Sequence, residues 1–262
     1  MNFTETLAQI TPAAEQTIQL PKKWGQGRAL FGGITAAIAW QCARYGAQDD
    51  QAIRSLSVLF VAPINDGEAQ LERRVLREGK SVSQIRVDIV QAGEVVLSAL
   101  ASFGRSREST IAVDAHARPD IPTPEQGPAM PEMSIVPEFT YHYDYRVTVG
   151  GLPFSGNKSR QFGGWMRFRH ETSHINPGFL LGLVDAWPPA LLPHLSQPAP
   201  ASSLSWTIEF IDPMPDKSAH DWWQYVADIE YAADGYGHTQ ASIWDNDGRL
   251  VALSRQTVTV FA

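Results

Sequence analysis

Residues 205–213 read SWTIEFIDP, and residues 55–63 read SLSVLFVAP. Each stretch alternates apolar and polar residues, which is typical of a strand with one buried face, and each ends in proline. The two prolines, Pro63 and Pro213, lie 150 positions apart. A repeat of this length predicts that the chain holds two copies of one module.

Two further pairs of segments repeat in the same order. The sequence FGGITAAIAW at 31–40 matches GFLLGLVDAW at 178–187, a shift of 147. The segment 87–103 matches 241–258, and each is predicted to be a strand, a glycine turn and a second strand. Nearly constant shifts and a shared order support a duplication, so each module is expected to hold one helix and several strands.

The middle of the chain separates the two copies. Six prolines crowd residues 109–137, which predicts an extended linker. We therefore expect an N-terminal module at 1–108 and a C-terminal module at 138–262. The strands are predicted at 53–62, 69–77, 81–91 and 94–103 in the first copy, and at 139–149, 164–169, 203–211, 222–231, 238–244 and 249–261 in the second.

One helix is predicted in each copy. The first runs from about Gly32 to Tyr45 and is apolar nearly all round, so other structure is expected to surround it. The second begins after Asn176-Pro177, a capping residue followed by a first-turn proline, and ends near Trp187, before two further prolines.

Length and composition exclude several classes of protein. The 262 residues are 44% hydrophobic and 19% charged, which is ordinary for a globular chain. The net charge of −7 is opposite in sign to that of a general nucleic-acid binder. One cysteine, Cys42, allows neither an internal disulfide nor a cysteine-rich zinc site. The N-terminus lacks a signal-peptide pattern and no apolar run approaches about 18 residues, so we expect a cytoplasmic protein without a membrane span.

The sequence resembles a known family. The segments FGG, VLREGKSVSQIRVDIVQ, LVDAW, SLSWTIEFIDP and DGRLVALSRQ are similar to those of the double hotdog acyl-CoA thioesterases, the TesB-like group, and the resemblance covers nearly the whole chain. It implies an α+β double hotdog fold, in which two tandem modules each wrap a curved antiparallel sheet around a long helix. It also implies an acyl-CoA substrate, hydrolysis to free acid and CoA, no cofactor, and a homodimer.

Asp185 is the first candidate for chemistry. It lies among leucine, valine, alanine and tryptophan, and its counterpart in the first copy is Ile38. A carboxylate in apolar surroundings is costly to bury without a partner, which indicates a general base with a shifted pKa. The other interpretation is an aspartate at a helix end that faces solvent.

Two polar strand residues are further candidates. Gln256 has Ala101 as its counterpart, and its amide either orients a water molecule or faces solvent as an ordinary strand residue. Ser203, Ser205 and Thr207 are expected to share one face, because strand side chains alternate.

The family resemblance gives these candidates roles. Double hotdog thioesterases use an aspartate on the second helix, a hydroxyl on the following strand and a glutamine on the last strand. The resemblance implies that Asp185, Ser203 and Gln256 hold these positions. Threonine is usual at the hydroxyl position, so Ser202 and Ser205 stay open as alternatives if the register differs.

Two glycines open the first helix. Gly32 and Gly33 allow a ligand to approach backbone N–H groups at a positive helix end, and they are equally compatible with tight helix packing. The second copy has Phe179-Leu180 at this place. In the related homodimeric single hotdog enzymes, a helix start and a carboxylate from opposite halves meet at one site. The resemblance therefore implies one site in which Gly32 and Gly33 of the first copy, holding an oxyanion, face Asp185 of the second.

A locally basic sheet in the first copy suggests a site for the CoA phosphates. Arg77 and Lys80 flank a turn and are the best candidates for that contact, although a solvated strand face also accounts for them.

Other functions are possible from the sequence. A non-catalytic acyl or acyl-CoA binder would share the fold, and a hotdog enoyl-CoA hydratase would need an Asp/His pair on one segment. The string His170-Glu171-Thr172-Ser173-His174 has the HExxH pattern of zinc peptidases. It lies between a predicted strand and a predicted helix, where its two histidines need not share a face, so no metal site is expected there.

Overall fold

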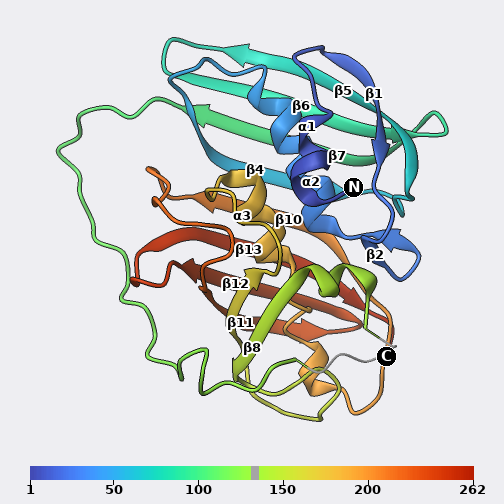
Figure 1. Ribbon diagram of the computed structural model, residues 1–262, viewed down its shortest axis with the longest axis vertical. Helices are drawn as coiled ribbons and strands as arrows, with labels where there is room; N and C mark the ends of the chain where they lie inside the picture. Colours follow the sequence, from blue (N-terminus) through green and yellow to red (C-terminus); the bar gives the residue numbers. More distant parts are fainter. Residues whose placement is uncertain (131–135) are drawn as a thin grey trace.

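The N-terminal half forms one helix-and-sheet module. The computed structural model describes residues 1–130 and 136–262. In the first half, a five-stranded antiparallel sheet of order β1-β5-β6-β7-β4 surrounds the apolar helix α2 (Figure 1). The elements are α1 (Phe3–Ala8), β1 (Glu15–Leu20), β2 (Gly25–Gln26), β3 (Ala29–Leu30), α2 (Gly32–Arg44), β4 (Ala52–Phe60), β5 (Gly67–Glu78), β6 (Val82–Gln91) and β7 (Glu94–Gly104).

The C-terminal half repeats this plan around a shorter helix. Its strands follow the order β10-β13-β12-β11-β9-β8 and surround α3. The elements are the 3-10 helix η1 (Glu138–His142), β8 (Tyr143–Val149), β9 (Gln161–Phe168), α3 (Pro177–Asp185), the 3-10 helix η2 (Leu192–His194), β10 (Ala201–Phe210), β11 (Trp223–Ala233), β12 (Tyr236–Trp244) and β13 (Leu250–Val260). None of the helices within the described residues is long and apolar enough to cross a membrane.

Strands β4 and β10 join the two modules into one eleven-stranded sheet (Figure 1). They pair antiparallel, and Ser57 lies directly opposite Thr207, its own counterpart in the repeat. The two hydroxyls are 3.4 Å apart. Equivalent residues face each other only on a twofold axis, so a pseudo-twofold axis of the duplicated fold passes through this pair.

Helices α2 and α3 lie together between the two sheets and run in opposite directions. The start of α2 meets the end of α3, because a Cβ atom on Gly33 would lie 3.1 Å from Asp185 Cβ. The end of α2 meets the start of α3, where a Cβ atom on Gly178 would lie 2.9 Å from the ring of Trp40. Asn176 caps α3 by accepting a hydrogen bond from the Phe179 N–H, as its place before a proline predicts.

The segment between the modules covers the outer face of the second sheet. The Trp165 indole donates to the Pro122 carbonyl at 2.8 Å, and the Gln224 amide donates to the Pro119 carbonyl at 3.0 Å. Arg118 lies over the Trp165 ring. Part of the predicted linker, residues 131–135, lies outside the described residues. Pro119 and Pro122 thus hold their carbonyl groups against amide and aromatic side chains of the sheet, whereas residues 109–117 are exposed.

Candidate active site

Asp185 and Gln256 meet between the two modules. Asp185 is the last residue of α3, and Gln256 lies on β13. The Gln256 side-chain amide donates a hydrogen bond of 2.9 Å to Asp185 Oδ1. Gln256 faces the helices rather than solvent, because it lies opposite the buried Trp206 in the β10–β13 pair. The interpretation of these two residues as ordinary surface side chains is therefore wrong.

The two glycines at the start of α2 make room for this carboxylate. A Cβ atom on Gly32 would lie 2.7 Å from Asp185 Oδ2 and 3.0 Å from the ring of Phe60, closer than side chains tolerate. The backbone N–H of Gly33 lies close enough to Asp185 to lower the pKa of its carboxyl group. The carboxylate thus lies at the positive end of α2, where negative charge is favoured.

Three influences set the protonation of Asp185. Burial raises the pKa of its carboxyl group. The hydrogen bonds from Gln256 and from the Gly33 N–H lower it. The resulting pKa is about 7. The residue keeps some exposure to solvent. A carboxyl group with these properties can accept a proton from water near neutral pH.

A β-bulge decides which serine faces the site. The β10–β13 register shifts between Ser203 and Ser205, so that Ser203 lies opposite the buried Val258 and Ser205 lies opposite Thr257. Ser203 is therefore on the inner face with Gln256, while Ser205 is on the outer face.

The expectation that Ser203, Ser205 and Thr207 share a face is wrong, because the extra residue Leu204 reverses the alternation. Ser202, opposite Thr259, is exposed. Within the described residues, the Ser203 hydroxyl makes no hydrogen bond to Asp185 or Gln256.

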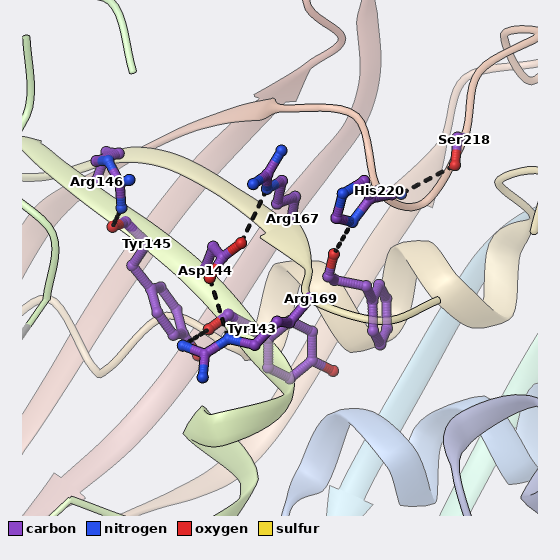
Figure 2. Close-up of polar contacts among 9 residues, drawn as sticks. Tyr143, Asp144, Tyr145, Arg146, Arg167, Arg169, Ser218 and His220 are labelled. Atoms are coloured by element: carbon purple, nitrogen blue, oxygen red, sulfur yellow. Dashed lines mark hydrogen bonds and ion pairs between the residues drawn. The ribbon is translucent and has the colours of Figure 1, made fainter. Parts of the chain in front are cut away.

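Strand β8 supplies an aromatic wall beside the site. Asp144 of β8 accepts hydrogen bonds from Arg167 on β9 at 2.9 Å and from Arg169, just after β9, at 3.1 Å (Figure 2). These contacts fix β8 against β9. The residues on either side of Asp144, Tyr143 and Tyr145, are buried on the opposite face, toward the helices.

The two tyrosines lie close to the end of α3. The Tyr145 hydroxyl donates to the Ala186 carbonyl at 3.0 Å. Burial, and after it the charge of Asp185, hold the pKa of that hydroxyl well above its usual range. The Tyr143 ring lies 6.0 Å from the ring of Phe31, the residue before Gly32. The sequence pattern does not indicate this wall, because strand β8 is distant in sequence from the end of α3 that it covers.

The equivalent position in the other half of the molecule is apolar. Ile38 and Ala101, the counterparts of Asp185 and Gln256, are both buried. Ile53, the counterpart of Ser203, precedes a β-bulge at the same place in β4 and is also buried. Phe179 occupies the position of Gly32. The duplication therefore retains the polar set on one side only.

The structure does not bring Arg77 and Lys80 to this set. Both are exposed at the end of β5, whose first residue Gly67 lies at the same end of the module as Gly32. The ten residue steps from Gly67 to Arg77 span roughly 30 Å of strand. Gln48, beyond the end of α2, bonds the neighbouring Glu78. Arg77 and Lys80 are therefore at the end of the module opposite Gly32. The predicted strand lengths alone do not show this position.

The remaining sequence candidates have structural partners. Glu171 of the HExxH string accepts hydrogen bonds from the backbone of Phe3 and Thr4 and so caps α1. His174 pairs with Asp216 in a loop, not on a helix. Cys42 is buried in α2, and burial raises the pKa of its thiol. Within residues 1–130 and 136–262, no group of three or more His, Cys, Asp and Glu side chains is placed to hold a metal ion.

Two surface hollows lie away from this set. The first hollow lies between the linker and strands β9 and β11, around Arg118, Trp165 and Gln224, and has a volume of about 360 Å³. The other surrounds Arg54 and Asp212, with a volume of about 420 Å³. Neither is lined by Asp185, Gln256, Ser203 or the α2 glycines, so cavity shape does not identify the site.

Comparison with known proteins gives a consistent result. Residues 20–104 match the family model of the acyl-CoA thioesterase N-terminal domain, and residues 114–260 match that of the acyl-CoA thioesterase C-terminal domain. No curated protein sequence matches the chain at the level required for a relative.

Solved structures share the whole architecture. A conserved hot dog fold protein of unknown function from Alicyclobacillus acidocaldarius is 25% identical, with a TM-score of 0.86 over 99% of this chain and 98% of its own. The acyl-CoA thioesterase II TesB2 from Mycobacterium marinum is 23% identical, with a TM-score of 0.76 over 95% and 93%. A tesB protein from Mycobacterium avium subspecies paratuberculosis is 16% identical, with a TM-score of 0.78 over 99% and 98%. The double hotdog fold expected from the sequence is confirmed.

Proposed function

The chain belongs to the acyl-CoA thioesterase family, with its N- and C-terminal domain models matched in order, and we propose that it hydrolyses acyl-CoA by means of a water molecule activated by Asp185. Thioester hydrolysis as such follows from the family. The observation that carries the proposed mechanism is the Asp185–Gln256 hydrogen bond at the start of α2.

The proposed reaction needs a base, a positioned water molecule and N–H donors. The Asp185 carboxylate takes a proton from water as the water oxygen attacks the thioester carbonyl carbon. Gln256 and Ser203 hold that water. The C–S bond then breaks, and the proton on Asp185 passes to the leaving sulfur, which gives free acid and CoA. No covalent enzyme intermediate and no cofactor enter these steps.

The start of α2 is the proposed site for the oxyanion. The first N–H groups of a helix have no partner within the helix, and the helix dipole adds positive charge there. Gly32 and Gly33 let a carbonyl oxygen approach these groups closely. The Gly33 N–H lies beside Asp185 in the ligand-free molecule, so an oxyanion would share this helix end with the base.

Release of free thiol from acyl-CoA esters of increasing chain length tests the proposal. We expect the wild type to act on at least one ester. Asp185→Asn is expected to lower kcat by about 10²–10⁴-fold, because it removes the proton acceptor. Calorimetry with CoA esters should show that this variant still binds them.

Two other outcomes would point to a different base or to a different function. Unchanged activity in Asp185→Asn would remove the proposed base while leaving the thioesterase family intact. Ester binding without hydrolysis by the wild type would make the chain an acyl-CoA binder.

A further inference from the structure

A short hairpin before α2, together with the two residues that lead into it, presents three cations. Strands β2 and β3 pair from Gly25 to Leu30 and lead directly into α2. Lys22 and Lys23 precede this hairpin and Arg28 is at its tip, and all three are exposed. None of the three forms an ion pair with any of the described residues. In a chain of net charge −7, these three cations outnumber the Glu138 carboxylate, which lies against the hairpin at Gly25.

Buried contacts hold the hairpin in place. The ring of Trp24 stacks on His142 with 3.7 Å between centroids. The His142 Nε2 atom lies 2.9 Å from the Lys23 carbonyl oxygen and donates to it. The Phe31 N–H donates to the Trp24 carbonyl at 2.9 Å. The cations are therefore presented from a fixed support at the start of α2.

The hairpin is also close to the reacting end of the proposed site. Arg28 precedes Gly32 by four residues, so their Cα atoms lie within about 14 Å of each other. Two cations of the second module already have carbonyl partners. Lys158 donates to the His194 carbonyl, and Arg160 donates to the Ile229 carbonyl at 2.6 Å.

We infer that Lys22, Lys23 and Arg28 bind the phosphate groups of the CoA substrate. The inference rests on the proposed function, which puts the thioester carbonyl at the start of α2. CoA carries its phosphates at the far end of a flexible arm, so they reach the protein surface some distance from that carbonyl. Exposed ammonium and guanidinium groups on a fixed hairpin suit such phosphates. Arg77 and Lys80, at the other end of the module, do not meet this requirement.

Steady-state kinetics with two substrates tests this inference. One is an acyl-CoA, and the other is the N-acetylcysteamine thioester of the same acid, which has no phosphates. For the variant Lys22→Gln/Lys23→Gln/Arg28→Gln, we expect KM for acyl-CoA to rise roughly tenfold at low salt with kcat unchanged. The kinetics with the N-acetylcysteamine thioester should stay as in the wild type.

A matched variant controls for the loss of positive charge. Arg77→Gln/Lys80→Gln removes two exposed cations far from α2 and should leave KM for acyl-CoA unchanged. The inference is overturned if the hairpin variant has an unaltered KM, if it loses activity equally on both substrates, or if the Arg77/Lys80 variant shows the larger effect.

Calorimetry with CoA alone separates this inference from the proposed function. If the wild type hydrolyses neither thioester, the proposed function fails. Weaker binding of CoA to the hairpin variant than to the wild type would still support the phosphate site. Equal binding by both proteins, or no binding by either, would overturn it.

Discussion

The carboxylate of Asp185 is held where burial and hydrogen bonding act on its pKa in opposite directions. Burial favours the protonated form, whereas Gln256 and the Gly33 N–H favour the charged form. The resulting pKa of about 7 leaves a useful fraction of carboxylate at neutral pH and a carboxylate basic enough to accept a proton. Gln256 is thus part of what determines the pH at which Asp185 can work.

The pH dependence of kcat/KM should reflect this balance. Activity needs the charged form of Asp185, so kcat/KM of the wild type should rise with pH to a plateau, with a midpoint at about pH 7. Gln256→Ala removes a hydrogen bond that lowers the pKa, so the midpoint should move to higher pH and the plateau should fall. Thr257→Ala, on the outer face of the same strand, should leave the profile unchanged. A midpoint in Gln256→Ala at or below that of the wild type would contradict this account.

Stability should change with pH for the same reason. The folded-state pKa of Asp185, about 7, lies above an unfolded value of about 3.9, so folding keeps a proton that the unfolded chain releases. The stability from this group is complete below about pH 4 and is lost as the pH rises through about 7.

Asp185→Asn cannot ionise and should therefore be more stable than the wild type at pH 8, by about 1–2 kcal/mol. Partial exposure of Asp185 keeps this figure below what the full pKa shift implies. Thermal unfolding at pH 5 and pH 8 measures the difference, which should grow between the two values. A stability difference between the two proteins that shrinks as the pH rises would show that ionisation of Asp185 does not destabilise the fold.

At the level of the strand, the bulge in β10 separates two serines that lie two positions apart. Ser203 faces the helices and Ser205 faces outward. We expect Ser203→Ala to lower kcat about tenfold or more, because one group that holds the water is lost. Ser205→Ala should have no effect on kcat. Thiol release by both variants tests this, and an equal loss in both, or a loss confined to Ser205→Ala, would assign the hydroxyl elsewhere.

At the level of the helix, the first residue of α2 must be glycine for the site to form. Alanine usually stabilises a helix relative to glycine by about 1 kcal/mol. In Gly32→Ala, however, the new Cβ atom would meet Asp185 Oδ2 at 2.7 Å. We expect kcat/KM to fall more than tenfold, because the carboxylate must move. Gly104→Ala at the end of β7, where the nearest atom to the new Cβ is Arg54 Cγ at 3.4 Å, is the matched control. Full activity in Gly32→Ala would show that Asp185 need not stay where it lies.

These elements differ in how far the sequence predicts them. The helices were predictable to within one or two residues, because α2 is apolar and α3 has a cap before proline. Most strands were predictable because they alternate. Helix α1 and strand β1 were not predicted, since a six-residue helix held by a distant Glu171 has a weak local pattern.

The site was predictable in part. Asp185 and Gln256 stand out as polar residues where the repeat has Ile38 and Ala101. The contact of Asp185 with Gly32 and Gly33 follows from the antiparallel helices. The bulge at Leu204 was not predictable, because a single inserted residue changes the facing of a strand without changing its composition. Nor does a turn sequence tell which end of a module it occupies, so the distance of Arg77 and Lys80 from Asp185 does not follow from the sequence. The roles of all these residues in chemistry stay predictions.

The whole molecule is a duplicated fold with two junctions at which the ends of α2 and α3 meet. One junction holds polar side chains and the other is apolar. At the first junction, the start of α2 lies beside the end of α3. At the second junction, the start of α3 lies beside the end of α2. The pseudo-twofold axis at Ser57 and Thr207 relates these two junctions. At the second junction, the short helix α1 also packs on α3, where Leu7 lies 3.0 Å from the Cβ position of Gly178. Symmetry in the backbone therefore does not extend to the side chains that could bind substrate.

This asymmetry predicts one substrate site per chain. Calorimetric titration with a non-hydrolysable thioether analogue of the best acyl-CoA substrate should give a stoichiometry of one, because only one junction combines glycines with a carboxylate and an amide. Ile38→Asp offers a check on the other junction. It places a carboxylate at a fully buried position of the apolar core, so it should destabilise the fold by about 3 kcal/mol and add no activity. Two analogue molecules bound per wild-type chain, or a gain in kcat in Ile38→Asp, would mean that the second junction still binds acyl-CoA.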